Sequence, residues 1–247
     1  MLVLLPPSES KASRRRGRPV EIAALSFPEL TGNRLEVTAA LEKVSADDDA
    51  LAVLGVGASL AGEVARNTEL ATAPALPVAE LYTGVLHDAL GLRQLPASAR
   101  RRAATRVLVA SALWGALRPG DRVPPYRLSM DVDLPGTGPL AGFWRRRLAP
   151  VLDEAASGHL VVDCRSAAYA AAWRPAAGAV AVRVLREQQG RRSVVSHMAK
   201  HTRGLVARHL LLRGGRDPRT PAQLAAAVGE AFDCTLRGDT LDVVVRT

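Results

Sequence analysis

Short apolar runs interrupted by proline and polar residues predict strands of a buried sheet. The clearest runs are LVLL (2–5), RVLVASA (106–112) and HLVVDC (159–164). A continuous apolar run suits a strand covered on both faces. The first run ends at Pro6 and Pro7, because proline cannot donate a hydrogen bond to a ladder.

The last third of the chain carries two further strand patterns. The segments 179–187 (AVAVRVLRE) and 191–196 (RRSVVS) predict a hairpin around Gln189-Gly190. The segment 241–246 (LDVVVR) predicts the final strand.

Apolar residues at helical spacing separate these strands. They predict helices over 34–44, 47–54, about 78–90, 143–152, 197 to about 213, and 221–232. The irregular alternation, with at least one hairpin, favours the α+β class: a mixed β-sheet flanked by helices. With no repeat or boundary visible, residues 1–247 are expected to form a single compact domain with one core.

The segment LGVG (54–57) has the pattern of a helix-hairpin-helix element, expected over about 47–67. Gly55 and Gly57 would let backbone N–H groups approach a DNA phosphate, and Ser59 and Arg66 follow on the second helix. An ordinary helix–helix turn with a glycine C-cap has the same pattern.

A long connection over 113–140 is rich in proline and glycine, which is typical of a functional loop. Arg118, Tyr126 and Arg127 lie on it, and such arginines are suited to bind phosphates or carboxylates. The alternative is a solvated loop in which these arginines pair locally with Asp121 and Asp131.

Two other segments supply candidate anion ligands. Arg165 and Ser166 follow the strand over 159–164 where a helix begins, and Lys200 and Arg203 lie near the start of a long helix. For Arg165 and Ser166, simple helix capping is the alternative. The pair His197 and His201 has metal-ligand spacing, but no acidic third ligand stands nearby, so we predict no metal site.

Ser8, Glu9 and Lys11 follow directly after the first predicted strand. Ligands commonly bind beyond the carboxyl ends of strands. The alternative is an edge strand with a solvated turn. Neither a P-loop nor a dinucleotide fingerprint is present in the sequence.

A formal net charge of +9 and a pI near 10.6 point to an anionic partner. DNA and nucleotide-like phosphates both fit, whereas few aromatic residues stand among the basic ones, so single-strand stacking is not indicated. No membrane-spanning run or signal peptide is present, which predicts a cytoplasmic protein that does not bind a membrane.

Five segments together resemble the peroxide-stress protein YaaA family, in family order across nearly the whole chain. They are MLVLLPPSESK (1–11), LYTGVLHDAL (81–90), VLVASALWGALRPGDRVPPYRLSM (107–130), DCRSAAY (163–169) and SHMAKHTRGLVARHL (196–210). The resemblance implies an α+β domain with a helix-hairpin-helix-like element at 54–61 and a basic cleft. It further implies a cytoplasmic DNA-binding protein that limits oxidative damage and intracellular iron under peroxide stress.

The chain departs from the family pattern at Trp114, where tyrosine is common, and at the glycine-rich turn GVG. The arginine-rich loop over 14–18 also differs, and its role stays open. Direct peroxide reduction is not favoured, because neither Cys164 nor Cys234 stands in an activating context and no haem or iron–sulfur spacing occurs. We therefore predict no cofactor.

Two hypotheses follow. In the first, the basic cleft and the hairpin bind DNA through its phosphates with little sequence preference. In the second, an enzyme site takes a nucleotide-like or other anionic molecule, with Glu9 as general base and Lys11 or Lys200 as nucleophile or electrophile. Both hypotheses are compatible, and the second requires that Glu9 and Lys11 lie near Arg127 and Lys200.

Overall fold

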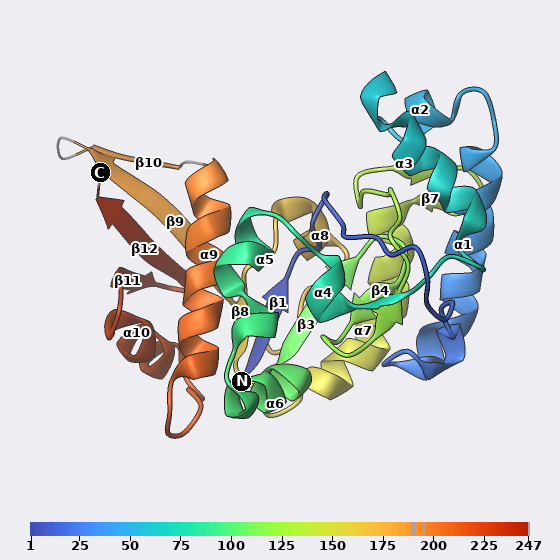
Figure 1. Cartoon of the computed structure of the whole chain (residues 1–247). Coiled ribbons are helices and arrows are strands. Elements are labelled where there is room, and N and C mark those ends of the chain that lie inside the picture. The colour runs from blue at the N-terminus through green and yellow to red at the C-terminus, as the bar shows by residue number, and fades with distance from the viewer. Residues whose placement is uncertain (189–190, 195, 247) are drawn as a thin grey trace.

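Seven strands form the main sheet in the order β11-β12-β9-β8-β1-β3-β4, and β10 pairs with β9 (Figure 1). The computed structural model describes the backbone of residues 1–188, 191–194 and 196–246, and the side chains of residues 1–188 and 198–246. The strands are β1 (Leu2–Leu5), β3 (Val107–Ser111), β4 (Gly115–Leu117), β8 (Val161–Asp163), β9 (Val180–Gln188), β10 (Arg191–Val194), β11 (Asp233–Arg237) and β12 (Thr240–Arg246).

The sheet is mixed. β1 runs parallel to β3 and β8, and β9 runs parallel to β8 and β12. β4, β10 and β11 are antiparallel to their neighbours. The predicted α+β class with a mixed sheet is confirmed. The apolar opening forms a fully buried strand at the centre, so the alternative of an edge strand is wrong.

Ten α-helices lie in the described part of the chain. They are α1 (Thr31–Ser45), α2 (Ala50–Val53), α3 (Ala61–Ala65), α4 (Val78–Leu81), α5 (Val85–Leu90), α6 (Ala97–Arg106), α7 (Leu140–Ala156), α8 (Ala167–Ala171), α9 (Ser196–Leu212) and α10 (Pro221–Gly229). Figure 1 shows α5 and α9 side by side on the near face of the sheet, with α1, α2 and α3 gathered beyond β4. None of the described helices has the length and apolarity to cross a membrane.

Three predicted elements differ from the structure. The helix expected over 78–90 is broken between α4 and α5, where Gly84 has φ 109°. The helix expected over 47–54 shortens to the four residues of α2. The connection over 113–140 contains β4, β5 (Arg122–Val123) and the two-stranded sheet of β6 (Asp133–Leu134) and β7 (Gly138–Pro139). β5 pairs with β2 (Leu76–Pro77), which lies earlier in the chain.

β11 was not predicted because its apolar face consists of only two half-buried residues, Cys234 and Leu236, which pack against the core between exposed polar positions. The hairpin of β9 and β10 is confirmed, while its turn at Gln189-Gly190 lies outside the described residues. The side chain of His197 also lies outside them.

A buried arginine joins α1 to the β3–β4 region. Arg34 is fully buried, and its guanidinium donates to the carbonyl oxygens of Trp114 at 3.1 Å, Ala116 at 3.1 Å and Ser26 at 2.6 Å. Three acceptors compensate much of the cost of burying this charge. The contact fixes the connection after β3, which carries Tyr126 and Arg127.

Candidate functional site

The carboxyl ends of β1, β3 and β8 meet at one edge of the sheet. The chain leaves β1 for β3 on one side and later crosses to β8 on the other side. Ligands bind in open α/β sheets at such a switch point, outside the carboxyl ends of the strands. We call residues 6–11, which follow β1, together with the groups around them the carboxyl edge.

Residues 6–11 lie against the break between α4 and α5. The Ser8 hydroxyl donates to the carbonyl oxygen of Thr83, and the Thr83 N–H donates to the carbonyl oxygen of Ser10 at 3.2 Å. A Cβ on Gly84 would lie 2.8 Å from Ser8 Oγ. Glycine is therefore required here for its positive φ and for the close approach.

Lys11 reaches back from this loop into a largely buried position. Its Nζ donates to the carbonyl oxygens of Ser8 at 2.9 Å and Glu9 at 3.4 Å, and lies 4.3 Å from the centroid of the Tyr126 ring. Burial lowers the pKa of Lys11 to about 8, because desolvation disfavours the charged amine. A share of this amine is therefore neutral near pH 8.

Three buried hydroxyls form a network behind Lys11. The Tyr126 hydroxyl lies 2.7 Å from Ser111 Oγ and 2.9 Å from the Tyr82 hydroxyl. Burial raises the pKa of both tyrosines, so they stay neutral. The network holds the Tyr126 ring in place under the amine.

Arg127 joins this edge to the region around α3. Its guanidinium pairs with Glu9 at 2.9 Å and with Glu63 of α3 at 3.5 Å. The Asn67 side chain holds the Arg127 backbone through bonds to its N–H at 2.8 Å and its carbonyl oxygen at 2.9 Å. Glu9 and Arg127 are thus brought together, which is one of the proximities that the enzyme hypothesis requires.

A cavity of about 270 Å³ opens at the carboxyl edge. Among the predicted residues, Ser8, Glu9, Ser166, Lys200 and Arg203 line it. The sequence reasoning missed Gly84, His87 and Cys164 as lining residues, although Gly84 and His87 lie in the LYTGVLHDAL segment. Arg203 Nε also donates to the carbonyl oxygen of Val182 at 2.9 Å, whereas Lys200 is exposed.

Lys11 opens instead into a small notch of about 30 Å³ next to this cavity. Glu63, Arg66, Pro125 and Tyr126 form its other walls. Ser8 and Glu9, whose carbonyl oxygens hold Lys11, line the larger cavity. Residues 8–11 therefore separate the two spaces.

Two predicted anion ligands lie elsewhere or are already occupied. Because β4 is antiparallel to β3, the chain runs back and places Arg118 at the amino end of β3, where it donates to the carbonyl oxygen of Thr105 at 2.6 Å. Arg118 therefore lines neither the cavity nor the notch. Arg165 is buried, pairs with Asp163 at 2.7 Å and donates to two carbonyl oxygens, those of Tyr169 and Trp173.

The glycine-rich turn joins two short helices, α2 of four residues and α3 of five. Gly55 has φ 65°, and Gly57, Ser59 and Arg66 are exposed. Ser59 lies on a short 3₁₀ helix, Ala58–Leu60, that precedes α3. Of the four predicted DNA contacts, Arg66 also lines the notch of Lys11.

Burial raises the pKa of the Cys164 thiol to about 12, and the pKa of Cys234 is raised as well. A thiol that stays protonated is a poor nucleophile toward peroxide. In the described part of the chain, no three His, Cys, Asp or Glu side chains cluster in a way that could hold a metal ion.

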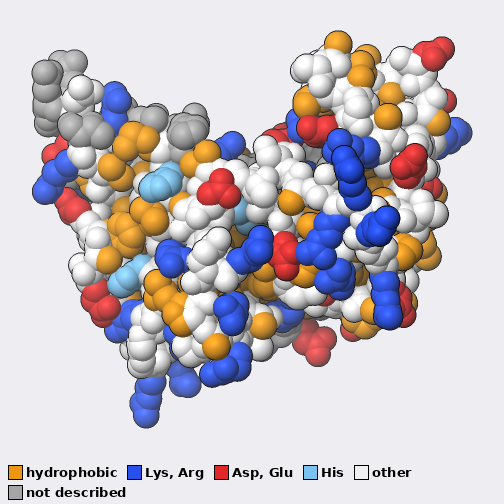
Figure 2. All heavy atoms as spheres, viewed as in Figure 1, with side chains coloured by type: hydrophobic (Ala, Val, Ile, Leu, Met, Phe, Trp, Pro, Cys, Tyr) orange, Lys and Arg blue, Asp and Glu red, His pale blue; other side chains and the backbone are white. Residues whose placement is uncertain are grey.

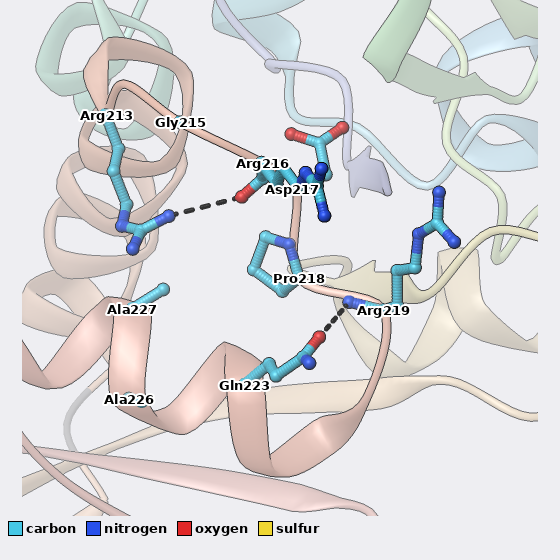
Figure 3. Close-up of a pocket in the computed structure, with 9 residues that line it drawn as sticks. All are labelled: Arg213, Gly215, Arg216, Asp217, Pro218, Arg219, Gln223, Ala226 and Ala227. Atoms are coloured by element: carbon cyan, nitrogen blue, oxygen red, sulfur yellow. Dashed lines mark hydrogen bonds between the residues drawn. The ribbon is translucent and has the colours of Figure 1, made fainter.

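A larger pocket of about 480 Å³ lies at the other end of the sheet (Figure 3). It is formed by the loop after α9 and by one face of α10, with Arg213, Arg216 and Arg219 among its lining residues. Figure 3 shows the Arg213 guanidinium donating to the carbonyl oxygen of Arg216, at 3.3 Å. None of the predicted site residues lies in it.

Comparisons with known proteins agree with the resemblance seen in the sequence. The family model described as peroxide stress protein YaaA matches residues 1–233. A UPF0246 protein of Streptomyces coelicolor is 53% identical over 234 residues, covering 92% of this chain and 89% of its own. A UPF0246 protein of Corynebacterium efficiens is 40% identical over 252 residues, covering 99% of this chain and 100% of its own. The chain therefore belongs to the family of the peroxide stress protein YaaA.

Proposed function

We propose that this protein acts in the cytoplasmic response to peroxide by binding DNA, through its phosphates, at the carboxyl edge and the α2–α3 turn. The observation that carries the proposal is the gathering of basic groups from distant segments around two adjoining spaces. Lys11 and Arg66 line the notch, Lys200 and Arg203 line the cavity, and Arg127 lies between them. Such a set of fixed cations suits a phosphate backbone.

The shape of this face supports the same proposal. Figure 2 shows it hollowed between the α2–α3 end and α9, with Lys and Arg side chains gathered over the segment that follows β1. That segment includes the exposed arginines of the 14–18 loop. A duplex lying in this hollow would contact the loop, the α2–α3 turn and the start of α9.

The test is a salt titration of DNA binding, measured by fluorescence anisotropy with several labelled duplexes of unrelated sequence. We expect the affinity to fall steeply with salt and to vary little with sequence. Arg66→Ala and Lys200→Ala should each weaken binding and lower the slope of log K against log salt by about 0.9.

The matched control is Arg216→Ala, an exposed arginine at the opposite end of the sheet, which should change neither quantity. Absence of salt-dependent binding to any duplex at low ionic strength would overturn the proposal. So would equal losses in Arg66→Ala and Arg216→Ala.

The cavity favours a second candidate function, an enzyme acting on a nucleotide-like anion. Its lining combines apolar side chains such as Pro7 and Leu86 with the polar groups of Ser8, Ser166 and Lys200. This mixture is typical of small-molecule sites. Thermal shift with a panel of nucleotides should show stabilisation that Lys200→Ala reduces, and no shift with any of them would reject this function.

A further inference from the structure

Lys11 carries a half-buried amine on which Glu9 and Glu63 act through space, without an ion pair. Its Nζ is held by two carbonyl oxygens, and no described carboxylate forms an ion pair with it. Lysine is among the residues least often buried unless it is paired. An amine that is partly buried and forms no ion pair is activated as a nucleophile, because desolvation favours its neutral form.

The space in front of the amine limits what can react with it. The notch is small, about 30 Å³ against about 270 Å³ for the cavity beside it. A space of this size suits a small group such as a carbonyl better than a nucleobase. Arg66 also lines the notch and provides a cation that can hold a neighbouring phosphate.

We propose that Lys11 forms an imine with an aldehyde carried next to a phosphate, and that its substrate is the ring-opened abasic deoxyribose of DNA. This inference rests on the proposed DNA binding. An abasic residue has lost its base, carries an aldehyde at C1′ and is flanked by phosphates. It therefore matches both the small notch and the adjacent arginine.

The step balances without an added reagent. The neutral Lys11 Nζ attacks C1′, an N–C bond forms while the C=O π bond breaks, and the carbonyl oxygen becomes a hydroxyl by taking a proton from solvent water. The amine proton passes to Glu63, which lines the notch and whose side chain is 41% exposed. Loss of the hydroxyl as water, with that proton, gives the protonated imine, which the face of Tyr126 stabilises as a cation.

The chain suits a trapping experiment, because Lys11, Lys43 and Lys200 are its only lysines. The full-length protein is incubated with a duplex containing one abasic site in the presence of sodium borohydride, which reduces an imine to a stable amine. We expect a covalent protein–DNA species on a denaturing gel, mapped to Lys11 by mass spectrometry. Trapping should rise with pH and level off above about 8.

Lys11→Arg keeps the positive charge and should reduce trapping at least tenfold. Lys43 lies on the exposed side of α1, so Lys43→Arg should leave trapping unchanged. Mapping the adduct in the unmodified protein keeps the test valid if the Lys11 variant fails to fold. An adduct on Lys43, Lys200 or the α-amino group, or no adduct, would overturn the inference.

A second probe separates this inference from the proposed function. A duplex with a tetrahydrofuran abasic analogue has no aldehyde and reports binding alone. Binding of that duplex without trapping of the aldehyde form would overturn the Lys11 inference and leave DNA binding intact. If the protein does not bind DNA but Lys11 is still trapped on free deoxyribose 5-phosphate, the proposed DNA binding is overturned. The role of the Lys11 amine as a nucleophile is then supported.

Discussion

Both ends of the central sheet are rich in basic residues, but the basic residues at the two ends make different contacts. At the amino end, Arg213 pairs with Glu230 at 2.8 Å, and Arg106 pairs with Asp217 at 2.9 Å (Figure 3 shows Arg213 and Asp217). These contacts tie α9 and α6 to the loop and helix that follow α9. At the carboxyl edge, Lys11 has no ion pair with a described carboxylate, and Lys200 is exposed beside the cavity.

Neither the number of arginines nor the size of a pocket identifies the candidate site. The amino-end pocket is larger, about 480 Å³ against about 270 Å³. What distinguishes the carboxyl edge is an amine held by carbonyl oxygens above a fixed aromatic ring, at a topological switch point. Charges that already pair within the protein contribute to the fold, and a ligand must compete with those pairs.

The largest effect is expected from a matched pair of glycine substitutions. Gly84→Ala combines a strained positive φ with a contact of 2.8 Å to Ser8 Oγ, and should destabilise the protein by on the order of 3 kcal/mol. Because Ser8 moves, DNA binding and trapping by Lys11 should both fall. Denaturant unfolding and anisotropy measure the two effects.

Gly215→Ala is the control at the amino end. Gly215 also has a positive φ, 80°, but its added Cβ would meet nothing within 4 Å. We expect a cost of about 1 kcal/mol from backbone strain and no loss of DNA binding. Equal functional losses in both variants would remove the distinction between the two ends.

The sequence could predict the carboxyl edge because parallel buried strands place their following residues together. Ser8, Glu9 and Ser166 each follow such a strand, and all three line the cavity. Arg118 could not be placed, because nothing in the local pattern shows that the chain reverses after Ser111 into an antiparallel strand.

Residue pairs that form only through tertiary packing could not be predicted from the sequence either. Glu63 lies far from Glu9 in the sequence, yet both pair with Arg127. The break at Gly84 follows from its contact with the Ser8 loop, which helical periodicity does not encode. Arg165 looked available in the sequence because its partner Asp163, two residues earlier, could equally have faced solvent.

We expect the stability of the protein at low pH to depend on His87, which lines the cavity at the carboxyl edge. This side chain is buried, and its Nε2 lies 3.0 Å from the carbonyl oxygen of Pro6. Burial lowers the pKa of His87 from 6.5 to about 4, so the unfolded chain takes up the proton first as pH falls. Stability should therefore decrease between pH 6.5 and 4, by up to roughly 3 kcal/mol.

The variant His87→Gln removes the titrating group and should flatten this part of the pH dependence, measured by urea unfolding at a series of pH values. A profile identical to that of the unmodified protein would show that another group controls acid stability. The Gln side chain keeps an N–H donor for the Pro6 carbonyl oxygen. A change in the slope of stability against pH therefore reports the titration of His87 more than the loss of its hydrogen bond.

At the amino end, Asp217→Asn should affect stability and leave function unchanged. The variant loses a partly buried ion pair with Arg106 and should cost about 1 kcal/mol. DNA affinity and its salt slope should match those of the unmodified protein, because the pair lies away from the carboxyl edge. A tenfold loss of DNA affinity would place the DNA across the amino end instead.

The smallest effect, and one of opposite sign, is expected from Glu9→Gln. Glu9 neutralises Arg127 through a contact of 2.9 Å and places a negative charge next to the proposed phosphate path. Its removal leaves Arg127 paired with Glu63 alone and should tighten DNA binding by about two- to fivefold at low salt, with the gain fading as salt screens the charges. Glu230→Gln removes the same charge from the Arg213 pair at the other end and should leave the affinity unchanged. If both variants tighten binding equally, net charge alone controls the affinity; if only Glu9→Gln does so, the DNA passes over the carboxyl edge.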